Sequence, residues 1–106
     1  MRDLHFVGST LDDLRAFPDS ARREAGYQLY RVQVGLDPSD WKPLKTVGAG
    51  VREIRLHTAG EFRVIYVASI GEVVYALHAF QKKTRKTPQV DIELARRRFR
   101  QLVQPR

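Results

Sequence analysis

The sequence contains no cysteine, which excludes a disulfide framework and a thiolate metal site. It has no apolar run near the roughly 20 residues that a membrane-spanning helix requires, and Met1–Phe6 lack the apolar core of a signal peptide. Internal repeats, low-complexity segments and a linker rich in Gly, Pro and Ser are also absent. We therefore expect a cytoplasmic protein whose residues 1–106 form one domain, held together by packing alone.

Carboxylates are scarce in the last quarter of the chain. Residues 82–106 contain nine Lys or Arg and two Asp or Glu, whereas residues 1–81 contain ten of each, so the net charge of +7 lies in the last quarter. An unbalanced cationic segment attracts polyanions, and nucleic acid is the first candidate because each neutralised phosphate releases condensed counterions. The alternative is an ordinary solvated surface, which is what most charge runs form.

The first half of the sequence predicts a short strand followed by two helices. Residues 4–7 are apolar and end at Gly8, as expected for a strand. Two sets of apolar residues then recur at helical spacing on either side of Pro18: Leu11, Leu14 and Phe17, and then Ala21, Ala25, Leu29 and Val32. We expect an antiparallel helical hairpin that ends near Gly35. Residues 36–50 hold four Gly or Pro and the only Trp, and they predict an irregular loop.

The second half predicts a sheet and a last helix. From Val51 apolar and polar residues alternate, and residues 62–67 and 73–80 continue this pattern after two turns, which indicates a three-stranded antiparallel meander. Thr87 is expected to cap the last helix, with Pro88 in its first position. The fold class is therefore α+β, a small antiparallel sheet packed against an N-terminal helical hairpin and a C-terminal helix. The helices are expected on one sheet face, with the other face left for function.

Several segments match a known family. They are Arg52-Glu53-Ile54-Arg55, the strand residues 62–66, residues 74–83, Thr87-Pro88 and residues 92–95. In this order they resemble the RelE/ParE-like toxins, and residues 77–88 followed by Ala-Arg-Arg resemble the phage-derived, HigB-like branch. The resemblance covers nearly the whole chain.

The resemblance implies the toxin of a type II toxin-antitoxin pair. RelE-like and HigB-like members cut messenger RNA, usually on the ribosome, without a metal or another cofactor, whereas ParE-like relatives poison DNA gyrase. A noncatalytic RNA-binding module would use the same charges for affinity alone, so three functions stay open. The implied partners are the ribosome with its messenger RNA and a small antitoxin, often a helix-turn-helix protein from the adjacent gene.

RNA cleavage needs a group that deprotonates the 2′-hydroxyl, cations for the charge on the phosphate and a proton donor for the leaving oxygen. The positions that match the family's catalytic residues are Arg63, His78, Lys82 and Lys83, and no metal site is expected. Further RNA contacts are expected from Arg55, Arg85 and Lys86. No Tyr follows the last strand, where some RelE members place a catalytic one, so the general base is unassigned.

Several of these residues have a structural alternative. Arg63 is equally well placed for an ion pair with Glu53, and strand alternation puts His78 on one face with Val74, Ala76 and Phe80, as a partly buried histidine. Tyr66 and Tyr75 could stack on a base or fill the core and the sheet surface. A solvated helix face, with a secondary attraction for RNA, is expected from Arg96, Arg97, Arg98 and Arg100. His57 is expected to be solvated.

Overall fold

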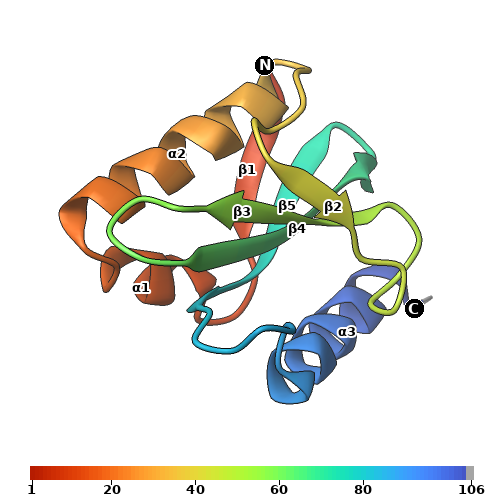
Figure 1. The fold of residues 1–106 in the computed structure, drawn as a ribbon. Helices are drawn as coiled ribbons and strands as arrows, with labels where there is room; N and C mark the ends of the chain where they lie inside the picture. Colours follow the sequence, from red (N-terminus) through yellow and green to blue (C-terminus); the bar gives the residue numbers. More distant parts are fainter. Residues whose placement is uncertain (105–106) are drawn as a thin grey trace.

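The sheet in this computed structural model, which describes residues 1–104, has five strands in the order β1-β5-β4-β3-β2 (Figure 1). The elements are β1 (Asp3–Phe6), α1 (Thr10–Arg15), α2 (Asp19–Gln33), β2 (Trp41–Pro43), β3 (Val51–Leu56), β4 (Phe62–Ile70), β5 (Val73–Gln81) and α3 (Gln89–Val103). The predicted α+β class and the antiparallel meander β3-β4-β5 are confirmed. β1 extends the sheet by pairing in parallel with β5.

The loop predicted for residues 36–50 is wrong in one place. Trp41–Pro43 forms β2, which pairs antiparallel with β3 and places Trp41 opposite Ile54. The strand has only three residues and ends in a proline, and proline is tolerated in a strand at a sheet edge because no neighbour needs its missing N–H. Such a short edge strand leaves too little alternation to be recognised in the sequence.

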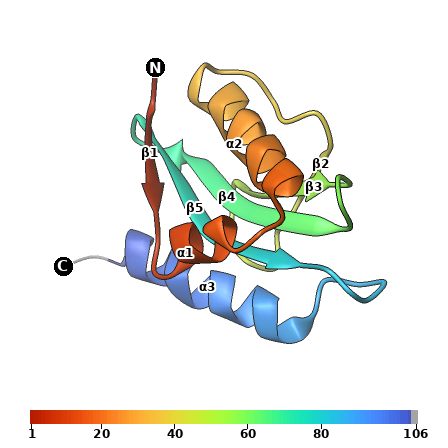
Figure 2. The same ribbon diagram turned by 90° about the vertical axis from the view of Figure 1, so that its left-hand side faces the viewer.

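The helices cover both faces of the sheet, not one as predicted (Figures 1 and 2). α1 and α2 pack on one face with the buried side chains Leu14, Phe17, Ala21, Ala25, Leu29, Val32, Ile54, Leu56, Phe62, Val64, Tyr66, Val74 and Ala79. α3 packs on the opposite face against Val51, Ile65, Val67 and Leu77. Helical periodicity shows which side of a helix is apolar but not which sheet face it meets. Within residues 1–104 no helix is long and apolar enough to cross a membrane.

A β-bulge in β5 changes which side chains share a face. Ile65 of β4 pairs with His78 but the next residue, Tyr66, pairs with Ala76, so Leu77 is an extra residue in β5. Val74 and Ala76 therefore face α2, whereas His78 faces α3. The expectation that His78 shares a face with Val74 and Ala76 is wrong, because strict alternation fails across a bulge.

Helix α3 begins differently from the prediction. Pro88 is the N-cap residue, and within residues 1–104 no side chain makes a capping hydrogen bond to this helix end. The hydroxyl of Thr87 instead donates to Oε2 of the buried Glu53 at 2.7 Å. Thr87 thus ties the start of α3 to the sheet, and its predicted role as a cap is wrong.

Candidate functional site

Strands β3 and β4 change from apolar to charged side chains along the face that carries α3. Val51, Ile65 and Val67 pack beneath the helix. Toward the β3–β4 turn, alternation places Glu53 and Arg55 of β3 and Arg63 of β4 on the same face. The same two-residue period that builds the core therefore also builds a charged cluster beside it.

Arg63 is buried, with its side chain only 6% exposed, and its guanidinium is paired on several sides. It donates to the Phe62 carbonyl at 2.9 Å and to Glu61 Oε1 at 3.1 Å. Its Nε lies 3.8 Å from Oε1 of Glu53, so the predicted ion pair between β3 and β4 is confirmed. Its predicted contact with RNA stays a prediction.

Glu53 is a fully buried carboxylate at the centre of the cluster. Oε2 accepts the Thr87 hydroxyl, and Oε1 lies 3.6 Å from Nζ of Lys42 on β2. Within residues 1–104, neither Oε1 of Glu53 nor Nε of Arg63 has a hydrogen-bond partner. Burying a charge is costly unless other charges compensate it, so Glu53 fixes the positions of the cations around it.

Lys82 extends from the end of β5 into the same cluster. Its backbone N–H donates to the Glu61 carbonyl at 2.8 Å, and its side chain is partly buried. Burial lowers the pKa of Lys82, the nearby charges of Arg63, Lys42 and Arg55 lower it further, and Glu53 opposes them. The structure thus brings together Arg55, Arg63 and Lys82 from the predicted site.

The other predicted basic residues lie outside this cluster, in the loop that follows β5. Lys83, Arg85 and Lys86 are exposed in the loop that projects between β5 and α3 (Figure 2). In the part of the chain that the structure describes, none of the three forms an ion pair with a carboxylate. They are therefore available to a polyanion.

His78 is buried against α3. Its Nε2 lies 2.6 Å from Oδ1 of Asp91 in the first turn of α3, and its ring stacks on Phe80 with centroids 5.0 Å apart. Phe80 in turn pairs with Arg63 across the sheet. This geometry favours the structural reading of His78, as an anchor for α3, and its part in catalysis stays a prediction.

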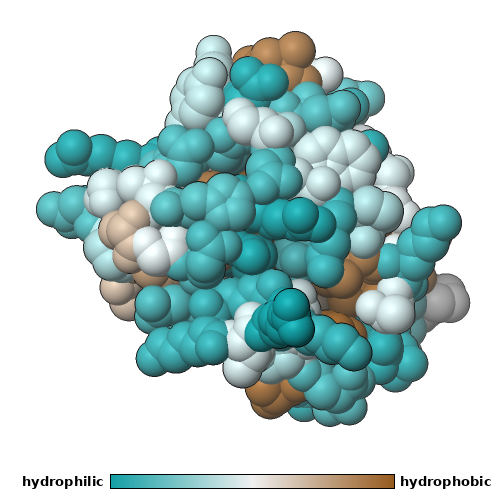
Figure 3. All heavy atoms as spheres, viewed as in Figure 1, coloured by the Kyte–Doolittle hydropathy of each residue, from teal (hydrophilic) through white to brown (hydrophobic). Residues whose placement is uncertain are grey.

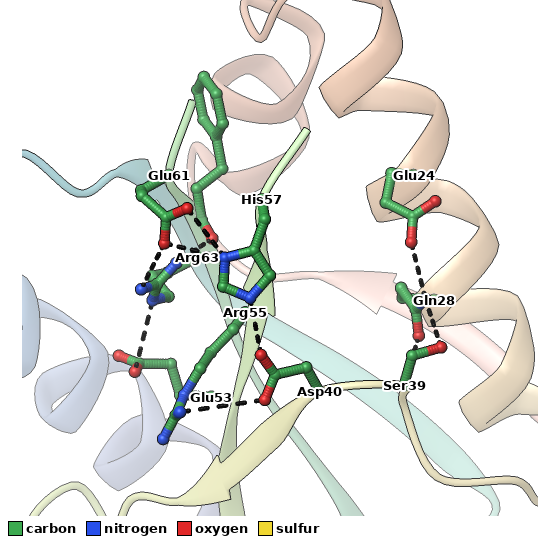
Figure 4. Close-up of polar contacts among 10 residues, drawn as sticks. Glu24, Gln28, Ser39, Asp40, Glu53, Arg55, His57, Glu61 and Arg63 are labelled. Carbon is green, nitrogen blue, oxygen red and sulfur yellow. Dashed lines mark hydrogen bonds and ion pairs between the residues drawn. The ribbon is translucent and has the colours of Figure 1, made fainter. Parts of the chain in front are cut away.

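The sequence reasoning missed a constellation around His57. This histidine follows β3, and its ring lies between Asp40 and Glu61, with Nε2 2.7 Å from Asp40 Oδ2 and Nδ1 2.8 Å from Glu61 Oε2 (Figure 4). Alternation from Glu53 through Arg55 to His57 was the signal that could have placed it at the site. Its partner Asp40 comes from the loop before β2, for which the sequence has no such signal.

Two residues of the supposed solvated face of α3 have structural contacts instead. Arg98 is partly buried and donates to the Leu77 carbonyl at 2.8 Å and to the hydroxyls of Thr10 and Ser9. Arg96 donates from Nε to the Thr46 carbonyl at 2.8 Å. The prediction is wrong for both, because helical spacing does not reveal carbonyl groups of neighbouring loops. Arg97 and Arg100 are exposed as expected.

The two tyrosines also differ from each other. Tyr66 is buried in the core beneath α2, and this burial raises the pKa of its hydroxyl. Tyr75 is partly exposed and packs edge-on against His5, with ring centroids 5.6 Å apart. Tyr66 is thus a core residue and is not presented to a base.

Hydrophilic side chains dominate the surface over β3 and β4 between α2 and α3 (Figure 3). Within residues 1–104, no three His, Asp or Glu side chains are placed to hold one metal ion. The cluster instead offers an arginine, two lysines and a histidine, Arg55, Lys42, Lys82 and His57, all at least partly exposed. Such an arrangement can bind a phosphate, since arginine and lysine donate charge-assisted hydrogen bonds to its oxygens.

A family profile described as phage-derived protein Gp49-like matches residues 12–100, which is most of the chain. This chain is a Gp49-like protein. The match confirms the predicted kinship with a phage-derived family. No curated protein sequence matches it.

Solved structures agree with the fold of this Gp49-like protein. The isolated E. coli RelE toxin superposes with a TM-score of 0.64 at 18% identity, over 92% of this chain and 98% of that one. The intact E. coli RelBE toxin-antitoxin complex contains a chain that matches with a TM-score of 0.59 at 15% identity, over 79% of this chain and 100% of that one. At these identities the likeness shows a RelE-like fold.

Proposed function

We propose that this Gp49-like protein is the toxin of a type II toxin-antitoxin pair and cuts translated messenger RNA on the ribosome. The observation that carries the proposal is the cluster of Lys42, Arg55, Arg63 and Lys82 around one buried carboxylate, beside an unbalanced basic loop. The RelE-like fold supports the same function.

In this proposal, Arg55 and Lys82 bind the scissile phosphate directly. Both are partly exposed, and both offer N–H donors to the negative charge that builds on phosphorus during attack. Arg63 does not contact the phosphate, but its buried charge raises the positive potential at the phosphate. Glu53 and Glu61 hold the Arg63 side chain in place. No metal takes part in this step.

The basic loop and His78 have separate tasks. Lys83, Arg85 and Lys86 neutralise phosphates of the flanking RNA and add to the affinity at low salt. Lys83 directly follows Lys82 in the sequence, and its positive charge adds to the potential that stabilises the scissile phosphate. His78 anchors α3 and holds Phe80 opposite Arg63, so its catalytic contribution is made through the position of these groups.

The proposed partner is an antitoxin, a helix-turn-helix protein encoded by the adjacent gene, which acts with this chain in the cytoplasm. The E. coli RelE toxin was crystallised with its antitoxin, which supports a comparable pair here. An acidic antitoxin surface would complement residues 82–100 and speed association.

Induction in cells tests the function. The chain is expressed alone and with its neighbouring gene, growth is followed, and the 5′ ends of cellular messenger RNA are mapped. The proposal predicts growth arrest with new 5′ ends inside coding regions, both suppressed by the neighbouring gene. Growth arrest with intact messages and trapped gyrase complexes would favour a ParE-like inhibitor, and RNA binding without any new end would favour a noncatalytic module.

A further inference from the structure

His57 is placed at the charged cluster by two carboxylates from different parts of the chain. Asp40 precedes β2 and contacts Nε2 at 2.7 Å, while Glu61 directly precedes β4 and contacts Nδ1 at 2.8 Å. The imidazole is nevertheless open to solvent, with 55% of its side chain exposed. A histidine that only filled a turn would not need a carboxylate on each ring nitrogen.

The same two carboxylates connect His57 to the arginines. Oε1 of Glu61 accepts from Arg63 at 3.1 Å, and Oδ1 of Asp40 lies 3.9 Å from NH1 of Arg55. Figure 4 shows the imidazole between Asp40 and Glu61, beside Arg55 and Arg63. A phosphate bound by Arg55 would therefore lie next to an imidazole whose orientation is already fixed.

The charges around His57 favour its protonated form. The hydrogen bond with Asp40 raises the pKa of His57 above its ordinary value, and the one with Glu61 adds to this, while burial opposes both. Arg55 and Arg63 also face this region, but each is paired with one of these carboxylates. His57 is therefore a proton donor near neutral pH, whereas an arginine is not, because its guanidinium keeps its proton in proteins.

We propose that His57 is the general acid of the RNA cleavage reaction, positioned by Asp40 and Glu61. This assignment rests on the proposed ribonuclease function. The 2′-oxygen forms a bond to phosphorus and gives up its proton to solvent, and the bond from phosphorus to the 5′-oxygen breaks. The Nε2 proton of His57 leaves its hydrogen bond with Asp40 and passes to that oxygen, while Glu61 keeps its contact with Nδ1. The products are a 2′,3′-cyclic phosphate and a 5′-hydroxyl, and the neutral imidazole regains a proton from water.

A change of leaving group tests this role directly. The cut site is first mapped on a short message bound to ribosomes, and a second message is then made with sulfur in place of the 5′-bridging oxygen at that phosphate. A thiolate leaves without protonation, so a general acid is needed only for the oxygen substrate. Single-turnover cleavage of both messages is measured for the wild type, for His57→Gln and for the control His5→Gln, which changes the histidine at β1.

The proposal predicts that His57→Gln slows cleavage of the oxygen substrate by about 100- to 10,000-fold and cleaves the sulfur substrate within a few-fold of the wild type. His5→Gln should cleave both like the wild type. Equal slowing on both messages would overturn the proposal in favour of a positioning role, and wild-type rates on both would overturn it outright. A wild type that cuts neither message would instead refute the ribonuclease function itself.

Discussion

Arg55 on β3 lies directly opposite Arg63 on β4 in the antiparallel register. Like charges in this position destabilise a sheet, and the chain compensates with carboxylates, Asp40 near Arg55 and Glu61 and Glu53 around Arg63. A sheet selected for stability alone would place an opposite charge or an uncharged residue at one of the two positions. Violations of a local rule are typical of functional sites.

Replacing Arg55 separates stability from activity. Arg55→Gln removes one of two facing cations, so we expect the free energy of unfolding to rise by about 0.2–1 kcal/mol, while RNA cleavage falls at least about 10-fold. Urea denaturation and message cleavage measure the two effects, with Arg22→Gln on α2 as the control, whose partner is the exposed Asp19. A loss of stability with unchanged cleavage would contradict the functional reading of this pair.

Lys82 is expected to matter more than other lysines. Lys82→Ala removes a cation whose pKa is lowered by burial and by Arg63, and loss of one such donor slows related reactions by about 100-fold or more. The exposed Lys45→Ala is the matched control and should retain wild-type cleavage. Similar rates for the two variants would place the reaction elsewhere on the molecule.

Thr87 supports the cluster from the start of α3. Thr87→Val keeps the shape of the side chain but leaves the buried Oε2 of Glu53 without its donor, which should cost about 1–3 kcal/mol of stability. Thr84→Val is the control, because Thr84 is exposed and its hydroxyl donates to the nearby Lys86 carbonyl, not to a buried carboxylate. The midpoint of urea unfolding measures both variants, and an equal small effect would show that Glu53 is satisfied in another way.

His57 should make stability depend on pH in a defined direction. Its folded-state pKa is raised, chiefly by Asp40, so its stabilising contribution is full below the unfolded pKa of about 6.5 and is lost as pH rises through the folded value. The lowered pKa of Glu61 acts in the opposite direction and only in acid. Unfolding of the wild type and of His57→Gln at pH 5.5 to 8.5 should converge toward alkaline pH, and a constant difference would argue against the two ion pairs.

Gly8 and Arg98 should be energetically coupled. A Cβ at Gly8 would lie 2.8 Å from the Arg98 guanidinium, and Gly8 has a φ of +58°. Gly8→Ala should therefore destabilise the wild type more than it destabilises the Arg98→Met variant, in which the clash is relieved. The interaction free energy between the two substitutions should be about 0.5–3 kcal/mol. Unfolding of the two single variants and the double variant measures this term. Additive effects would indicate that only the backbone strain at Gly8 matters.

The core strands were predictable because their alternation is local. β3 and β4 bury one set of side chains and present Glu53, Arg55 and Arg63 in the same two-residue period. This period fails at Leu77, where the bulge reverses the pattern of β5. Nothing in the sequence around Leu77 distinguishes a bulge from a regular strand.

Contacts between distant segments could not be predicted, because alternation along a strand is a local pattern. Asp40 reaches His57, and Thr87 reaches Glu53, only through the tertiary fold, and Asp40 comes from a loop whose course follows from the unrecognised β2. Hydrophobic patterning also cannot choose between the two faces of a sheet for α3. The sequence therefore indicated Arg55, Arg63 and Lys82, with Glu53 as a partner of Arg63. Lys42 and the carboxylates Asp40 and Glu61 emerged only from the structure.

The most direct test is cleavage of one message on purified ribosomes. The wild type is compared with the double variant Arg55→Ala, Lys82→Ala. This variant spares the buried Arg63, because removing Arg63 would take away one of the charges that compensate the buried Glu53. The account predicts a defined new 5′ end with the wild type and its loss in the variant, which should unfold at a similar urea concentration. An intact message with the wild type, or an equal cut with the variant, would contradict the central claim.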